Sequence, residues 1–319
     1  MLNLSRLVLL ALGIALAAPL TALAAYPEKP VKIIVPFGAG GSSDMSARLI
    51  AKAIEKDKGV SIAVVNIAGG GTAPGNLEAS KARPDGYTLL WQHKTLITAH
   101  HTGVSALNWD AFTPICNVLL FNEVLHVHKD NAAISTMPAL LEKAKENPES
   151  LRFPVQIGAG AHFGALAVEK AGGVTFHIIA SGGDMDRLNE QLGRRVDVVF
   201  QSIPPTLPHI EAGTIIPIAV GAEERDPKLP DVPTFRELGY DIITTFNLGL
   251  YGPKGLPEDI VRWWEEAVRQ VLADTDLQAE LAKQSLYPAY RESQAFAAML
   301  QHLDKELYDL AKVGGLLPQ

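Results

Sequence analysis

Short runs of β-branched and aliphatic residues alternate with amphipathic segments along the first part of the chain. Strands are predicted at 31–35, 62–65 and 87–91, and a helix over 44–56 carries apolar side chains at helical spacing between polar ones. Strands that alternate with helices in this way are typical of units built around parallel strands. This part of the chain is therefore expected to form one α/β unit.

The alternation restarts after a region of weak periodicity at 107–116. The elements predicted there are strands at 124–127, 153–157, 176–179, 196–200 and 215–220, and helices at 137–145, 161–171 and 184–192. Ser135 or Thr136 is placed to cap the first of these helices. Pro217 cannot donate a ladder hydrogen bond, so it predicts an edge or a break in the last strand.

The extended stretch 241–251 is interpreted as the return of the chain to the first unit, and from Pro257 on the pattern is helical. We therefore predict an α/β fold with two lobes, each a mainly parallel sheet flanked by helices. The expected boundaries are 25–122 together with 247–319 for the first lobe and 123–246 for the second. A chain of 319 residues fits two domains.

Residues 1–24 have the order of a secretion signal. Arg6 supplies a positive charge, an uninterrupted apolar run covers 7–18, and an Ala-Leu-Ala sequence at 22–24 provides a cleavage pattern. A membrane span needs about 20 apolar residues, and Pro19 interrupts the run earlier. We predict a removable signal peptide and an exported mature protein, with a permanent N-terminal anchor helix as the alternative.

The charge balance and the cysteine count narrow the possible functions. With 28 basic against 35 acidic residues the formal net charge is −7, so the basic footprint of a nucleic-acid-binding protein is missing. No second apolar run approaches membrane-spanning length, which predicts a soluble mature chain. Cys116 is the single cysteine, so no intrachain disulfide can form, and its apolar neighbours predict a buried, inert thiol.

Glycine-rich loops follow predicted strands in both lobes. The first, 36–44, joins the first strand to the first helix, and two others cover 158–162 and 180–184. Glycines let the backbone turn tightly and expose N–H groups, and a helix N-terminus attracts an anion. Ligands bind at the carboxyl ends of strands in such sheets. We therefore predict a cleft between the lobes that binds a carboxylate or a phosphate.

Other chemistries fit the sequence less well. Gly38-Ala39-Gly40 suggests a dinucleotide loop, but Ser43 stands where a third glycine or alanine belongs, and Asn66 where an acidic residue should hold a ribose. The sequence contains no Gly-x-Ser-x-Gly or His-Glu-x-x-His motif. An exported hydrolase is an alternative because histidines lie near the predicted cleft, but no nucleophile and base are recognisable. No metal site and no cofactor are predicted.

A series of motifs runs through the whole mature chain. Its members are 26–37, Gly40, Gly41, Asp44, 84–90, His162, Asp197, Val198, Phe200, Ala212, Gly213, 229–234, Gly249, Leu250, Pro253 and 255–257. This series resembles the substrate-binding receptors of tripartite tricarboxylate transporters, also called Bug receptors. The resemblance implies a periplasmic binding protein of type II, a Venus flytrap that closes on an organic acid and is not an enzyme. The implied partners are integral membrane transporter subunits, with presentation of the ligand to a membrane sensor as the alternative. The receptor is expected to act as a monomer.

The resemblance also implies that the acid is held largely through backbone N–H groups of the glycine loops. Together with polar residues beside the predicted cleft, the candidate ligand-binding residues are Phe37, Gly38, Ala39, Gly40, Gly41, Ser42, Ser43, Asp44, Gln92, His93, Lys94, Gly158, Gly160, Ala161, His162, Ser181, Gly182, Gly183, Asp184, Gln201 and Asn247. Whether Lys94 or Arg187 contacts the ligand stays open, since each could pair with a carboxylate. The run 180–183 lacks the Tyr-Lys-Gly frequent in the family, which leaves the identity of the acid open.

Overall fold

A computed structural model describes residues 26–318 of the chain. The predicted signal peptide, 1–24, lies outside the described residues. Within the described part, every helix is too short or too polar to cross a membrane.

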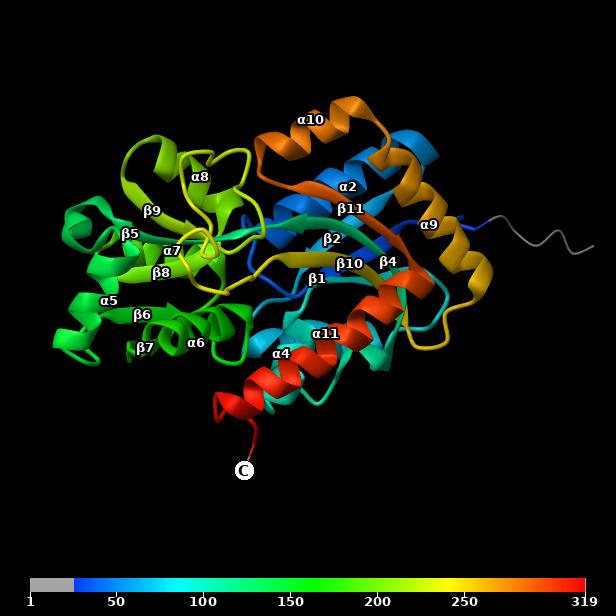
Figure 1. Cartoon of the computed structure of the whole chain (residues 1–319). Coiled ribbons are helices and arrows are strands. Elements are labelled where there is room, and N and C mark those ends of the chain that lie inside the picture. Colours follow the sequence, from blue (N-terminus) through cyan, green and yellow to red (C-terminus); the bar gives the residue numbers. More distant parts are fainter. Residues whose placement is uncertain (1–25, 319) are drawn as a thin grey trace, which may run out of the picture.

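A six-stranded sheet, counted over residues 26–318, forms the centre of what we call lobe 1 (Figure 1). Its strands are β1 (Val31–Val35), β2 (Ile62–Asn66), β3 (Thr88–Gln92), β4 (Phe112–Phe121), β10 (Phe246–Pro253) and β11 (Tyr287–Glu292), in the order β11-β4-β10-β3-β1-β2. β1 pairs parallel with β2 and β3, whereas β10 pairs antiparallel with β3 and β4.

Helices cover both faces of this sheet because its strands carry apolar residues on both sides. One face packs on α2 (Ser42–Lys58), α9 (Glu258–Leu272) and α10 (Thr275–Lys283); the other packs on α3 (Ala73–Ser80), α4 (Thr95–His101) and α11 (Ser293–Val313). Ile33 belongs to the first core and its neighbour Ile34 to the second, since successive strand side chains point to opposite faces.

Lobe 2 contains the other two sheets. A three-stranded sheet has β5 (Glu123–His128) between β8 (Val198–Ser202) and β9 (Ile215–Val220), and β6 (Arg152–Val155) pairs parallel with β7 (His177–Ala180). The helices are α5 (Met137–Glu146), α6 (Gly160–Gly172), α7 (Asp184–Leu192) and α8 (Ile203–Glu211). Thr136 caps α5 as expected, because its side chain accepts from the Ala139 amide at 3.4 Å.

The six-stranded sheet is mixed, the three-stranded sheet is antiparallel and the two-stranded sheet is parallel, which corrects the expectation of mainly parallel sheets. β5 pairs antiparallel with both β8 and β9, and β10 does the same between β3 and β4. β5 and β10 are the strands by which the chain enters a lobe from the other one. They therefore start at the boundary between the lobes, where β1, β3 and β8 end, and must run in the opposite direction.

The chain crosses between the lobes at two neighbouring places. Asn122 alone separates β4 from β5, and Thr245 comes directly before β10 on the return path. The Thr245 hydroxyl donates to Asn122 Oδ1 at 3.0 Å, which ties the two crossings together. Sheet membership changes between Phe121 and Glu123 and again just before Phe246, which pairs with Phe121 in the lobe 1 sheet. The predicted lobe boundaries at 122/123 and 246/247 stay a prediction.

Several elements were not expected from the sequence. α3, α4, α8 and most of β4 lie where no regular element was predicted, and β11 interrupts a C-terminal part that was predicted to be helical throughout. The expectation for Pro217 is confirmed, because β9 is an edge strand of its sheet. Cys116 is fully buried in the core of lobe 1, where burial raises the pKa of its thiol.

Candidate functional site

A cavity of about 200 Å³ lies between the two lobes. The N-terminal ends of α2, α6 and α7 meet at its wall, represented by Ser42, Gly160 and Asp184. The first N–H groups of a helix have no intrahelical acceptor, and the helix dipole places partial positive charge there. The wall of this cavity is therefore suited to an anion.

The loop before α2 is held in shape by Asp44. Gly40 has φ +81°, a left-handed conformation that favours glycine, and its N–H donates to Asp44 Oδ2 at 2.9 Å. Arg48 and Asn66 both donate to Asp44 Oδ1 at 2.9 Å. Burial raises the pKa of Asp44, but the hydrogen bonds from Arg48 and Gly40 outweigh it and keep the pKa below its usual value. Asp44 is thus an ionised support of the loop.

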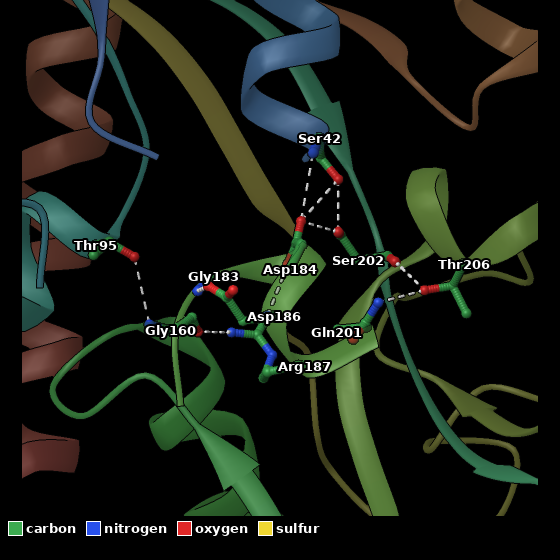
Figure 2. A network of polar contacts seen from close by, with 11 residues as sticks. Ser42, Thr95, Gly160, Gly183, Asp184, Asp186, Arg187, Gln201, Ser202 and Thr206 are labelled. Atoms are coloured by element: carbon green, nitrogen blue, oxygen red, sulfur yellow. Dashed lines mark hydrogen bonds and ion pairs between the residues drawn. The ribbon is translucent and has the colours of Figure 1, made fainter. Parts of the chain in front are cut away.

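Asp184 carries a carboxylate from lobe 2 to the N-terminus of α2 in lobe 1 (Figure 2). Its Oδ2 accepts from Ser42 Oγ at 3.2 Å, from the Ser42 amide at 3.4 Å and from Ser202 Oγ at 2.5 Å. Its Oδ1 accepts from Arg187 Nη2 at 2.7 Å. One carboxylate of the protein already occupies a helix N-terminus here, as the electrostatics of that position favour.

The start of α6 approaches lobe 1 so closely that only glycine fits at position 160. The Gly160 amide donates to Thr95 Oγ1 at 3.4 Å, and a Cβ at this position would collide with the Phe246 ring and come within 3.2 Å of Lys94 Cε. Ala161 follows in the first turn and lines the cavity.

Aromatic rings form the apolar part of the wall. The His93 ring stacks on Phe37 with centroids 4.5 Å apart and meets Phe246 edge-on at 4.6 Å. Burial, with a smaller contribution from the charge of Lys94, holds the pKa of His93 well below its ordinary value, so the ring is neutral. Nδ1 accepts from the Thr95 amide at 3.2 Å, which leaves the ring hydrogen on Nε2 as a donor.

Two buried charged side chains, Glu123 and Arg187, also line the cavity, with 2% and 4% of their surface exposed. Burial raises the pKa of Glu123 to about 7, against the opposing charges of Lys94 and Arg187. Burial likewise lowers the pKa of Lys94 to about 8, opposed by Glu123. Lys94 Nζ donates to the Thr244 carbonyl at 2.8 Å and lies 3.8 Å from the centre of the Phe246 ring.

The structure brings about half of the candidate residues together at the cavity. Those that line it are Phe37, Gly38, Ala39, Gly41, Ser42, Ser43, His93, Gly160, Ala161, Gly183 and Asp184. Those outside its lining are Gly40, Asp44, Gln92, Lys94, Gly158, His162, Ser181, Gly182, Gln201 and Asn247. Contact of any of them with a ligand stays a prediction. Arg187, which the sequence left open, lines the cavity.

Several candidates outside the lining are bound to neighbouring side chains. Gln92 donates to Asn76 at 3.0 Å, and Gln201 donates to Thr206 at 2.7 Å. Asn247 Oδ1 accepts from Asn117 Nδ2 at 3.4 Å. The side-chain amides of these candidates are thus bonded within the protein.

Lining residues that the sequence analysis missed are Thr95, Phe121, Glu123, Gln156, Ala159, Met185, Asp186 and Phe246. Ala159 lies within the loop 158–162, and Met185 and Asp186 follow the loop 180–184, so these three could have been added from their position alone. Glu123 and Phe246 begin the strands that enter each lobe, and no local motif marks them. Over residues 26–318, no group of at least three His, Cys, Asp or Glu side chains is arranged to hold a metal ion.

Two α/β lobes, a double crossing and a cavity lined by helix N-termini define a two-lobed solute-binding protein. Residues 46–314 match the model of the tripartite tricarboxylate transporter family receptor. The chain belongs to this family, whose members are periplasmic solute-binding receptors and not enzymes. The resemblance inferred from the sequence motifs is thereby confirmed.

Relatives support the assignment over nearly the full length. A "UPF0065 protein in gbd 5'region" of Cupriavidus necator is 31% identical over 95% of this chain and 93% of its own. The structure of periplasmic binding protein BugD is 28% identical, with a TM-score of 0.86 over 92% of this chain and 100% of its own. MatC from Rhodopseudomonas palustris, with bound malate, is 25% identical, with a TM-score of 0.82 over 89% and 99% of the two chains.

Proposed function

We propose that this protein captures a small organic carboxylate between its lobes in the periplasm and delivers it to the membrane subunits of a tripartite tricarboxylate-type transporter. The observation that carries the proposal is the meeting of the N-termini of α2, α6 and α7 at one cavity. An anion bound there is stabilised by backbone N–H groups and helix dipoles. The malate bound to the related MatC is a ligand of this chemical class.

The energetics of such a site are adequate for a receptor. A micromolar dissociation constant corresponds to about −8 kcal/mol. Hydrogen bonds to a charged group contribute roughly 1.5–3 kcal/mol each, and the costs of immobilising ligand and lobes are subtracted from their sum. The Ser42 and Gly160 amides already donate to Asp184 and Thr95, so the other amides in the first turns of α2 and α6, together with His93 Nε2–H, would be the donors to the acid. Closure of the lobes would then exclude water from the acid.

Isothermal titration calorimetry with malate, adipate, citrate and benzoate tests the proposal. We expect micromolar binding of at least one acid, and a loss of at least about tenfold in affinity for His93→Phe, because phenylalanine keeps the ring stacking but lacks the Nε2–H donor. His302→Phe, at a side chain that is 77% exposed, is the matched control and should bind as the wild type does. If no acid of any class binds to the folded protein, the proposal is wrong.

Export and delivery are tested separately. We expect mass spectrometry of the periplasmic protein to find an N-terminus near residue 25, and a chain starting there from a new Met to stay in the cytoplasm. Uptake of the bound acid should require both this receptor and its membrane subunits. An uncleaved periplasmic chain would contradict the removable signal, and uptake that is unaffected by deletion of the receptor would contradict delivery.

A further inference from the structure

We propose that Glu123 forms a subsite for a cationic amine, so that the ligand is a carboxylic acid that also carries an ammonium group. This inference rests on the proposed function and names the substrate class of the same cavity. The cavity would then bind two opposite charges of one small molecule, the carboxylate at the helix N-termini and the ammonium group at Glu123.

Glu123 is fixed in place but incompletely bonded. It is the first residue of β5, opposite Ser202 of β8, and its carbonyl accepts from the Gly221 amide at 2.9 Å. Its side chain is 2% exposed and lines the cavity, and within residues 26–318 its buried Oε2 has no hydrogen-bond partner. A buried carboxylate oxygen without a donor is costly, so a donor brought by the ligand would be strongly favoured.

The neighbouring cations donate to other groups, although within residues 26–318 the buried Nε of Arg187 has no hydrogen-bond partner. Arg187 donates to Asp184 at 2.7 Å and to the Gly182 carbonyl at 3.1 Å. Lys94 Nζ donates to the Thr244 carbonyl at 2.8 Å and lies over the Phe246 ring. Among the described residues, neither cation forms an ion pair with Glu123. Glu123 therefore lines the cavity without a direct counter-ion in the described part of the chain.

The charge balance of the wall favours an added positive charge. In the described lining, Glu123, Asp184 and Asp186 are acidic and Arg187 is the single guanidinium. Asp184 is fully engaged with Ser42, Ser202 and Arg187, and Asp186 accepts from the Gly183 amide at 3.1 Å. A second carboxylate of a plain diacid beside Glu123 would add repulsion, whereas an ammonium would donate a charge-assisted hydrogen bond.

Calorimetry with matched acids, which differ only by the amine, tests this inference at pH 7.5. The pairs are propionate and alanine, succinate and aspartate, and glutarate and glutamate. We expect the wild type to bind the amino member of at least one pair at least tenfold more tightly. Glu123→Gln should lower the affinity for that amino acid at least tenfold while leaving or raising the affinity for its plain partner. Glu142→Gln, an exposed residue of α5, is the control and should change neither.

The outcomes separate this inference from the proposed function. If the wild type binds plain acids as tightly as or more tightly than their amino partners, the amine subsite is wrong while carboxylate capture stands. The inference is also wrong if the Glu123→Gln variant, with a wild-type circular dichroism spectrum, keeps the full preference for the amine. Binding of none of these probes, nor of malate, adipate, citrate or benzoate, overturns both. The matched-pair comparison in the wild type decides the matter even if the variant fails to fold.

Discussion

The contact between Asp184 and Ser42 joins the two lobes, and its removal is expected to open the protein. Asp184→Ala deletes the acceptor of the Ser42 hydroxyl at 3.2 Å and of its amide at 3.4 Å. The bonds of Asp184 to Ser202 and Arg187 lie within lobe 2, so their loss affects the open and the closed state alike. Only the contacts with Ser42 change the balance between the two states.

The size of this effect follows from the geometry. A hydrogen bond to a charged group contributes about 1.5–3 kcal/mol. The value here lies near the lower end, because the Ser42 hydroxyl keeps its 2.6 Å bond to Ser202 and the amide contact is long. A change of about 1.5–2 kcal/mol in closure lowers the ratio of closed to open protein roughly 10- to 30-fold.

Small-angle X-ray scattering without added acid measures the result. We expect the wild type to match the radius of gyration of this structure and Asp184→Ala to be larger, with Asp186→Ala, on the same helix, as the control. Ser42→Ala should also enlarge the protein, because it removes the bonds of the Ser42 hydroxyl to both Asp184 and Ser202. The effects in the double variant should be less than additive, because the two residues share the bond between the Ser42 hydroxyl and Asp184. A wild-type radius of gyration for Asp184→Ala, or fully additive effects, would refute the reasoning.

Further predictions concern stability and the shape of the site. Asp197 accepts from Arg152 Nε and Nη2 at 2.8 and 2.9 Å; burial raises its pKa, but these bonds outweigh burial and hold the pKa below its usual value. This stabilisation is present above about pH 4 and is lost as the pH falls through the pKa of Asp197 in the folded state. In urea unfolding, Asp197→Asn should therefore lower the free energy of unfolding by about 1 kcal/mol at pH 7 and by less at pH 3. An equal loss at both pH values would contradict this. Gly160→Ala should lower the melting temperature and the affinity for the acid, since a methyl group collides with Phe246 and overpacking costs about 1–3 kcal/mol; unchanged melting and calorimetry would argue against the close approach. Asp44→Asn should weaken binding severalfold in calorimetry with little change in melting, because the loop loses the charged acceptor of the Gly40 amide; wild-type affinity would show that this support is dispensable.

Local pattern was sufficient for elements whose stability is decided locally. The helix predicted at 184–192 is α7 with the same bounds, because an acidic N-terminal turn and an amphipathic stripe lie within one short segment. Glycine loops can likewise be recognised from their composition, and the loops 36–44 and 158–162 both contribute residues to the cavity lining. α8 escaped prediction because Pro204, Pro205 and Pro208 suggest a loop. Pro204 and Pro205 lie in the first turn, where prolines fit a helix, and Pro208 lies inside the helix.

The remainder of the site depends on contacts between distant parts of the chain. Glu123 and Phe246 are 123 positions apart, and each stands at the first position of a strand, without a motif around it. Their proximity follows from the antiparallel entry of β5 and β10, which strand periodicity does not encode. Gln201 is a polar residue that the sequence suggested for ligand binding, but its side chain donates to Thr206 and does not line the cavity. Which polar residue faces a cavity is thus decided by tertiary register.

The two neighbouring chain crossings between the lobes form the place about which a hinge motion would occur. Asn122 and Thr245 are bonded to each other where the chain crosses, so a hinge motion of the lobes would turn about that point. Phe121, Glu123 and Phe246 flank these crossings and line the cavity, so a ligand bound there would lie close to the axis of such a motion. A molecule one bond longer near the axis would hold the outer ends of the lobes apart by several times that length. Ligand size would thereby become an angle between two outer surfaces, which a membrane partner touching both lobes could sense without touching the ligand.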